Sequence, residues 1–236
     1  MDKQHNHSKT AEPTELVDYF PEFKELYRDN TSSGSGIAFE HAAALFRHVV
    51  KNKPVECIEI GMANGVSTIA ICSALKFNGK GRLISVDPYQ TTQWNSQGLK
   101  RLEAASLNKY HTLMERPDYS VLPRLLDDNL RIDFGYIDGW HTFDYTLLDF
   151  WYIDKMLSEG GVVAFNDCGM RAVTKAIKFV MTHRAYIEED VGLIKRYEAS
   201  NFLKSVVRRL TDFRTNDRYF RKIKGGEPDW NFYADF

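Results

Sequence analysis

The chain has 236 residues, of which 43% are hydrophobic and 27% charged, the ordinary usage of a globular domain with a sizeable core. Lys and Arg number 31 against 32 Asp and Glu, so the formal net charge is -1 and no overall cationic field exists to attract nucleic acid. The three cysteines, Cys57, Cys72 and Cys168, form no CxxC pair, which argues against a disulfide framework or a zinc knuckle.

No stretch approaches the roughly 20 apolar residues that a transmembrane helix needs, and the polar N-terminus does not resemble a signal peptide. We therefore expect a cytoplasmic protein without membrane contacts. Four segments are expected: a disordered N-terminus (1–13), N-terminal helices (14–52), a core domain (53–198) and a C-terminal extension (199–236). The extension is basic and then aromatic, which predicts docking onto the domain or contacts in a homo-oligomer.

The predicted elements alternate between helices and short apolar strands along the chain. Two helices come first, over 14–29 and 37–51. The predicted strands are 55–61, 82–87, 111–116, 131–138 and 160–167, followed by a closing pair over 185–190 and 191–198. The predicted helices between and after them are 66–77, 94–109, 119–129, 143–158 and 170–183. This alternation predicts an α/β fold with a doubly wound, mostly parallel sheet of about seven strands.

A glycine turn follows the first of these strands. The strand ends at Ile60, Gly61 and Gly65 open the turn, and a helix begins near Val66. Glycine lets backbone N–H groups approach a ligand closely, and the helix N-terminus adds a positive dipole end. The GxxxG spacing lacks the second glycine of a dinucleotide fingerprint, which weakens the case for a pyrophosphate. Glu59 would suit an ammonium group, so the turn indicates a ligand with an amino-acid end.

Asp87 ends the next strand, about 20 residues beyond the glycine turn, where a carboxylate accepts hydrogen bonds from ribose hydroxyls. A zwitterionic, methionine-like group joined to a nucleoside fits both features, and that molecule is S-adenosylmethionine. The predicted cofactor is therefore S-adenosylmethionine. An NAD-linked oxidoreductase on a Rossmann-like fold is the alternative from a different class.

Polar side chains also end the fourth and fifth predicted strands. Asp138 ends the fourth, and Asn166 and Asp167 end the fifth. Because ligands bind outside the carboxyl ends of such strands, these residues should converge with Asp87. Carboxylate and amide oxygens are the ligands that Mg²⁺ takes, so Asp138, Asn166 and Asp167 are a candidate metal site. The metal would lower the pKa of an acceptor hydroxyl.

His141 follows Asp138 by three residues, and its ordinary pKa of about 6.5 suits a general base. Roles outside catalysis and metal binding stay open: Asn166 and Asp167 could cap a helix, Asp138 could bind only the cofactor, and His141 could be structural. Asp144, Asp149 and Asp154, on the following helix, are expected to face solvent or to cap. The expected core or cavity-wall aromatics are Tyr89, Trp94, Tyr119 and Trp140.

The segment EIGMANGVS resembles the first motif of the class I S-adenosylmethionine-dependent methyltransferases, and Asp87 resembles their second-strand acid. The resemblance covers residues 37–197 and implies the Rossmann-like methyltransferase fold. It implies that Asp87 holds the ribose and that residues 115–126 border the adenine. The implied methionine-pocket residues are Glu59, Gly61, Gly65 and Ser67.

Residues 134–168 resemble the small-molecule O-methyltransferases, including the macrocin and sugar group. In that family, the positions of Asp138, Asn166 and Asp167 bind Mg²⁺, and the position of His141 supplies the base. The order Asn-Asp at 166–167 departs from the family pattern.

The predicted function is the transfer of a methyl group from S-adenosylmethionine to a hydroxyl of a small molecule, such as a sugar or glycan precursor, with assistance from Mg²⁺. In this prediction Asp138 and His141 are catalytic, and Asp138 also contacts the cofactor. A metal-independent N- or O-methyltransferase that uses His141 alone is an alternative. A non-catalytic assembly domain and an RNA methyltransferase acting through the basic tail are weaker alternatives.

Overall fold

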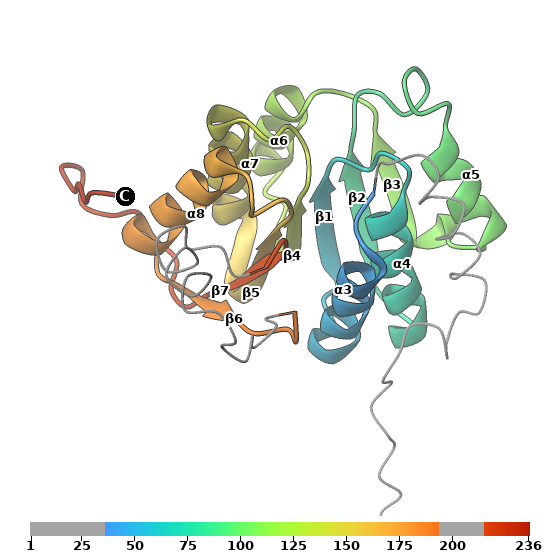
Figure 1. Ribbon diagram of the computed structural model, residues 1–236, viewed down its shortest axis with the longest axis horizontal. Coiled ribbons are helices and arrows are strands. Elements are labelled where there is room, and N and C mark those ends of the chain that lie inside the picture. Colours follow the sequence, from blue (N-terminus) through green and yellow to red (C-terminus); the bar gives the residue numbers. More distant parts are fainter. Residues whose placement is uncertain (1–35, 194–214) are drawn as a thin grey trace, which may run out of the picture.

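One seven-stranded sheet runs through the protein, which is described here by a computed structural model covering residues 36–193 and 215–236 (Figure 1). The strand order is β3-β2-β1-β4-β5-β7-β6. Strands β1 to β5 pair in parallel, and β7 pairs antiparallel with both β5 and β6. The predicted α/β fold with a mostly parallel sheet is therefore confirmed. The strands are β1 (Glu56–Ile60), β2 (Arg82–Val86), β3 (His111–Met114), β4 (Ile132–Ile137), β5 (Leu157–Phe165), β6 (Tyr186–Glu189) and β7 (Arg218–Lys222).

Helices cover both faces of the sheet. One hydrophobic cluster joins the sheet to α3, α4 and α5, and a second joins it to α6, α7 and α8. The helices are α3 (Phe39–Asn52), α4 (Val66–Asn78), α5 (Gln97–Ala104), the 3-10 turn η1 (Asn108–Tyr110), α6 (Asp118–Asp127), α7 (Phe143–Met156) and α8 (Arg171–His183). The predicted helix over 94–109 is thus shorter than expected and is followed by the 3-10 turn. The predicted helix over 14–29 lies outside the described residues.

Side chains of each central strand alternate between the two clusters because successive residues of a strand point to opposite faces. In β1, Cys57 packs toward α3 and α4, whereas Ile58 and Ile60 pack toward α6 and α7. Both faces of the strand are buried, which explains why its sequence is nearly continuous in apolar residues. Glu59 lies on the same face of β1 as Cys57, so its side chain also points toward α3 and α4.

The last strand of the sheet corrects one prediction. The expected closing pair was 185–190 and 191–198, and among the described residues of these two ranges only those of the first form a strand, β6. Residues 191–193 are not in a strand, and 194–198 lie outside the described residues. The partner of β6 is instead β7, within the segment predicted to be a C-terminal extension. Tyr219 and Phe220 of β7 are fully buried, so this segment supplies part of the core.

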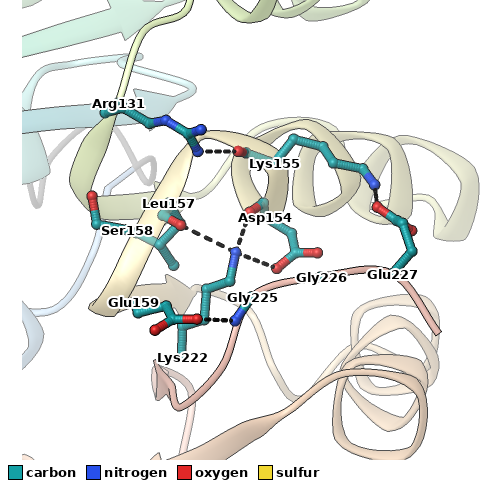
Figure 2. A pocket seen from close by; sticks show the side chains of 10 residues that line it. All are labelled: Arg131, Asp154, Lys155, Leu157, Ser158, Glu159, Lys222, Gly225, Gly226 and Glu227. Atoms are coloured by element: carbon teal, nitrogen blue, oxygen red, sulfur yellow. Dashed lines mark hydrogen bonds and ion pairs between the residues drawn. The ribbon is translucent and has the colours of Figure 1, made fainter.

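Lys222 anchors β7 to the end of α7, at the amino edge of the parallel strands. Its ammonium group donates to the backbone oxygens of Asp154 and Leu157 and lies 3.1 Å from Asp154 Oδ1 (Figure 2). A cation suits the negative end of a helix dipole. Arg184 and Tyr186 also donate to Asp154. Asp154 is therefore buried among donors, which corrects the expectation that it faces solvent or caps the helix.

This cluster borders a cavity of about 400 Å³. The charged side chains around this cavity contact one another or the backbone: Lys155 pairs with Glu227, and Arg131 donates to the backbone oxygen of Lys155. The arrangement ties the C-terminal strand to the sheet and explains why a charged strand, RYFRK, is stable inside it.

The C-terminal aromatics divide into docked and exposed groups. The ring of Phe236 packs 5.4 Å from that of Phe179 on α8 and 5.2 Å from that of His183, whereas Trp230 is 96% exposed. Figure 1 shows the chain end beside α8. In residues 36–193 and 215–236, each helix is either too short or too polar to cross a bilayer.

Candidate active site

The glycine turn between β1 and α4 packs against the carboxyl end of β4. Gly61 has φ +86°, and a Cβ there would lie 2.2 Å from the backbone oxygen of Asp138. Gly65 has φ +78°, and a Cβ there would lie 2.8 Å from the Cα of Gly98. Both positions therefore require glycine for conformation and for space. The turn lies where the strand order reverses between β1 and β4, the place where open α/β sheets bind ligands.

Asp87 ties the end of β2 to this turn. Its Oδ2 accepts hydrogen bonds from the backbone N–H groups of Met62 and Ala63, at 3.1 and 2.8 Å. Its Oδ1 accepts one from Tyr89 N–H at 2.8 Å. A carboxylate has about four acceptor positions, so Oδ1 keeps acceptor capacity for a ligand. Asp87 is held rigidly and lines a cavity.

The cavity has a volume of about 420 Å³ and opens at the carboxyl ends of β1, β2 and β4. Three of the predicted cofactor residues line it: Gly61, Asp87 and Asp138. The expectation that the four singled-out aromatics are core or cavity walls is correct, since all of them line this cavity. The aromatic wall residues are Tyr89, Trp94, Tyr119, Trp140 and Tyr145.

Glu59 lies away from this cavity, in contrast to the expected contact with an ammonium group. It is fully buried on the α4 side of β1, where Ser67, Thr68 and Ser85 donate to its carboxylate. Burial raises the pKa of Glu59 to about 7, against the three hydroxyl donors that lower it. Strand alternation is the cause, because Glu59 and Ser85 share the face that α4 covers. Ser67 is engaged by Glu59, and neither Ser67 nor Gly65 is among the wall residues of the cavity.

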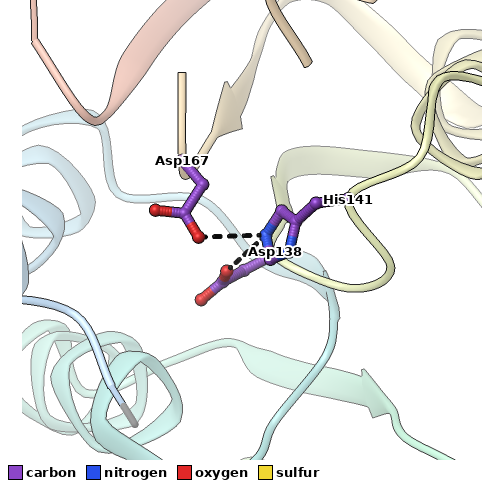
Figure 3. Close-up of side chains that lie close together, drawn as sticks. All are labelled: Asp138, His141 and Asp167. Atoms are coloured by element: carbon purple, nitrogen blue, oxygen red, sulfur yellow. Dashed lines mark ion pairs between the residues drawn. The ribbon is translucent and has the colours of Figure 1, made fainter. Parts of the chain in front are cut away.

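Asp138, His141 and Asp167 converge beside the cavity (Figure 3). The Nε2 atom of His141 lies 3.4 Å from Asp138 Oδ1 and 3.4 Å from Asp167 Oδ2. Burial raises the pKa of Asp138 to about 6, with smaller contributions from Asp217 and Asp167, while His141 lowers it. Hydrogen bonding to Asp138 raises the pKa of His141. Asp138 belongs both to this group and to the cavity wall, so it joins the two.

Asn166, predicted as a metal ligand, is placed in a different network. Its amide nitrogen donates to Asp217 Oδ1 at 2.6 Å, and Asp217 is fully buried. His41 Nδ1 lies 3.0 Å from the same oxygen, and Tyr136 donates to Asp217 Oδ2 at 3.3 Å. Asp217 was not among the predicted site residues, because no strand was predicted near it.

Asn216, the neighbour of Asp217, also contributes to the site. Its side-chain amide donates to Asp167 Oδ1 at 3.0 Å, and its backbone oxygen accepts from Cys168 N–H at 2.9 Å. Asp167 has φ +51°, a conformation that non-glycine residues adopt only where the surroundings support it. Asn216, in the segment just before β7, therefore holds Asp167 so that its other oxygen faces His141.

The three side chains fit a divalent cation in part. One ligand atom from each of Asp138, His141 and Asp167 lies within 4.8 Å of the others, and the two 3.4 Å separations suit atoms bound roughly 2.0–2.3 Å from one ion. Mg²⁺ takes oxygen ligands, whereas imidazole suits metals such as zinc, iron and nickel. The donor set therefore favours a transition metal over the predicted Mg²⁺.

Comparison with known proteins supports the fold and the resemblance. Residues 58–168 match the model of a family described as a methyltransferase domain, which confirms the predicted resemblance and enzyme class. No curated protein sequence matches the chain significantly.

Solved structures share the fold at low sequence identity. An O-methyltransferase from Bacillus cereus in complex with S-adenosylhomocysteine is 14% identical, with a TM-score of 0.62 over 71% of this chain and 81% of that chain. The tomaymycin-synthesis O-methyltransferase from Streptomyces achromogenes, solved with S-adenosylmethionine, is 15% identical, with a TM-score of 0.63 over 88% and 90%. A methyltransferase from Podospora anserina bound to S-adenosylhomocysteine is 13% identical, with a TM-score of 0.60 over 89% and 88%.

Proposed function

We propose that this chain transfers a methyl group from S-adenosylmethionine to a hydroxyl of a small molecule. The observation that carries the proposal is the adjacency of two features at the carboxyl edge of the sheet. The cavity lined by Gly61 and Asp87 can hold a nucleoside, and the Asp138–His141–Asp167 group beside it can remove a proton. A predicted sugar or glycan-precursor acceptor stays part of the proposal.

The cavity suits the nucleoside half of the cofactor. Asp87 is fixed by backbone N–H groups and keeps acceptor capacity on Oδ1 for a ribose hydroxyl. Gly61 leaves the turn without a side chain, so the backbone can approach a ligand closely. The matching family and the solved structures with S-adenosylmethionine or S-adenosylhomocysteine support this choice of ligand. Glu59 is not assigned a ligand contact, because its carboxylate is engaged by three hydroxyl groups.

S-adenosylmethionine supplies an electrophilic methyl group when it is bound. The acceptor hydroxyl is a poor nucleophile until it loses its proton, and His141 would take that proton as the oxygen attacks the methyl carbon. The bond between this carbon and the sulfonium sulfur breaks as the new bond to oxygen forms, and S-adenosylhomocysteine is the leaving group. Asp138 and Asp167 stabilise the resulting imidazolium, since each has an oxygen 3.4 Å from Nε2. The raised pKa of His141 is the direction expected for a base that must hold a proton briefly.

A bound divalent cation is the second candidate for activating the hydroxyl. Asp138, His141 and Asp167 would hold it, and it would lower the pKa of the acceptor hydroxyl. Because a metal on His141 Nε2 would prevent that atom from acting as the base, the two roles are alternatives.

Isothermal titration tests the cofactor. We expect S-adenosylmethionine and S-adenosylhomocysteine to bind with one site per chain and micromolar affinity, and Asp87→Ala to weaken both. No binding of either ligand at sub-millimolar concentration would overturn the proposal.

Chelation tests the metal. If His141 acts as the base, methyl transfer to a hydroxylated acceptor will persist after exhaustive EDTA treatment. Loss of activity with EDTA, restored by Mn²⁺ or Zn²⁺ more than by Mg²⁺, would instead establish the metal-assisted reaction with His141 as a ligand.

A further inference from the structure

A buried side-chain amide joins the loop after β2 to the glycine turn. Gln90 is fully buried, and its Nε2 atom donates to the backbone oxygen of Ala63 at 2.8 Å and to Asp87 Oδ2 at 3.0 Å. Both partners are acceptors, so they fix which end of the amide is the nitrogen. Because an amide nitrogen carries two hydrogens, these two bonds use its whole donor capacity.

Ala63 is held at both of its backbone polar groups by Asp87 and Gln90. Its N–H group donates to Asp87 Oδ2 at 2.8 Å, and its oxygen accepts from Gln90. The backbone of Ala63 has φ +45°, a left-handed conformation that non-glycine residues keep only where the surroundings support it. Ala63 also lines the cavity beside Asp87. The three residues therefore form a closed ring of hydrogen bonds in the wall of the cavity.

This ring decides which oxygen of Asp87 is left for a ligand. Asp87 Oδ2 accepts from the Gln90 amide and from the N–H groups of Met62 and Ala63. Among the described residues, Asp87 Oδ1 accepts only from Tyr89 N–H. A carboxylate has about four acceptor positions, so Oδ2 is saturated and Oδ1 keeps room for one more donor. Turning the carboxylate to exchange its two oxygens would take Oδ2 away from its three donors.

The other end of the Gln90 amide makes no comparable contact. Its Oε1 is buried, and within residues 36–193 and 215–236 no group donates a hydrogen bond to it. Gly98, near the start of α5, lies beside this oxygen, since a Cβ there would be 3.2 Å from Oε1. The polar contacts that Gln90 makes with the cavity wall are therefore those of its nitrogen. An apolar side chain of the same length would fill the same space and lose both bonds.

We propose that Gln90 is a positioning residue that, by holding Asp87 Oδ2 and Ala63, directs Asp87 Oδ1 to accept a hydrogen bond from a ribose hydroxyl of the bound cofactor. The identity of this ligand rests on the proposed function. Gln90 is not among the wall residues of the cavity, so its effect on the ligand passes through Asp87. It sets how strongly the cavity selects a nucleoside that carries ribose hydroxyls.

The test compares two ligands that differ only in these hydroxyls, S-adenosylhomocysteine and its 2′,3′-dideoxy analogue, by isothermal titration. The native chain should prefer S-adenosylhomocysteine by about tenfold or more, since the analogue loses a hydrogen bond to a charged group. Gln90→Met keeps the length of the side chain and removes the donor. It should weaken S-adenosylhomocysteine binding by about tenfold and leave the affinity for the dideoxy analogue within about threefold.

Two further variants show whether the effect passes through Asp87. Asp87→Ala should abolish the preference, and adding Gln90→Met to it should change the remaining preference by less than about twofold. Gln97 is exposed on α5 and does not line the cavity, so Gln97→Met is the matched control and should bind both compounds as the native chain does. If Gln90→Met loses affinity equally for the two compounds, its role is only structural and the proposal is overturned. An unchanged preference in Gln90→Met would overturn it as well.

A second measurement on the native chain needs neither a ligand nor a variant. By NMR, the side-chain amide protons of Gln90 should exchange with solvent at least about 100-fold more slowly than those of the exposed Gln97. Equally fast exchange would overturn the positioning role even if Gln90→Met fails to fold. A native chain that binds neither compound would overturn the proposed function and with it the ribose contact, whereas slow exchange would distinguish that failure from a misplaced Gln90.

Discussion

Replacing Gly61 by alanine tests how closely the glycine turn packs against β4. The backbone of Gly61 has φ +86°, a conformation that costs an L-residue about 1–2 kcal/mol. The added Cβ would also lie 2.2 Å from the backbone oxygen of Asp138 and 3.0 Å from the Cα of Gly139. Neither neighbour is a flexible side chain, so the turn or the end of β4 must move.

The magnitude follows from adding the two effects. Forcing extra volume into a packed site costs about 1–3 kcal/mol. The sum predicts that Gly61→Ala lowers the free energy of unfolding by roughly 2–5 kcal/mol. Moving the Asp138 backbone would also disturb its side chain beside His141, so S-adenosylhomocysteine affinity should fall as well.

Gly79→Ala is the matched control. Gly79 has φ +72°, and a Cβ there would meet no atom within 4 Å. This variant should lose only the conformational part, about 1–2 kcal/mol, and should bind S-adenosylhomocysteine normally. Both free energies of unfolding are measured by urea denaturation. Equal losses of stability in the two variants would refute the inferred close packing of Gly61 on Asp138.

Three further predictions concern buried charge and catalysis. Because the pKa of Glu59 is raised to about 7 in the folded chain from a usual value of 4.5, the stability from its neutral form is complete below about pH 4.5 and lost as pH rises through about 7. Across this pH window, the native chain should therefore lose roughly 3 kcal/mol of unfolding free energy relative to Glu59→Gln, as measured by denaturation at a series of pH values. A difference between the two proteins that does not change with pH would contradict the raised pKa of Glu59. Lys222→Ala should lower the free energy of unfolding by about 2–4 kcal/mol, because it leaves Asp154 and two backbone oxygens short of a donor. Lys224 is exposed, so Lys224→Ala should change the free energy of unfolding little. Similar losses in the two variants would contradict the anchoring role of Lys222. His141→Gln should lower the rate of methyl transfer by about 10²–10⁴-fold and leave S-adenosylhomocysteine affinity within about threefold, and an unchanged rate would remove His141 from the chemistry.

The fold could be predicted because the central strands of the sheet correspond to short apolar runs in the sequence. The central strands are buried on both faces, so their sequences are nearly continuous in apolar residues and end at glycine or acid positions such as Gly61 and Asp87. The convergence of Asp138 and Asp167 also followed from the parallel order of the strands. β7 could not be found this way, because its sequence, RYFRK, is charged and its stability depends on distant partners such as Asp154 and Glu188.

The site was harder to predict than the fold because side-chain direction depends on strand register. Glu59 was expected to contact a ligand, but it points to α4, on the same face of β1 as Cys57. Asn166 was expected to share a metal ion with Asp167, yet the two side chains bind different partners, Asp217 and Asn216. Asp149 is fully buried, contrary to the expectation that it faces solvent or caps its helix, and it could not be recognised as buried because that helix is apolar on more than one side.

A crystal structure of the chain with S-adenosylhomocysteine is the most direct measurement of cofactor binding. We predict density for the nucleoside inside the 420 Å³ cavity, with a ribose hydroxyl within hydrogen-bond distance of Asp87 Oδ1 and the sulfur facing the side of Asp138 and His141. A ligand bound elsewhere, or a ribose that does not reach Asp87, would contradict the assignment of this edge of the sheet as the methyl-donor site.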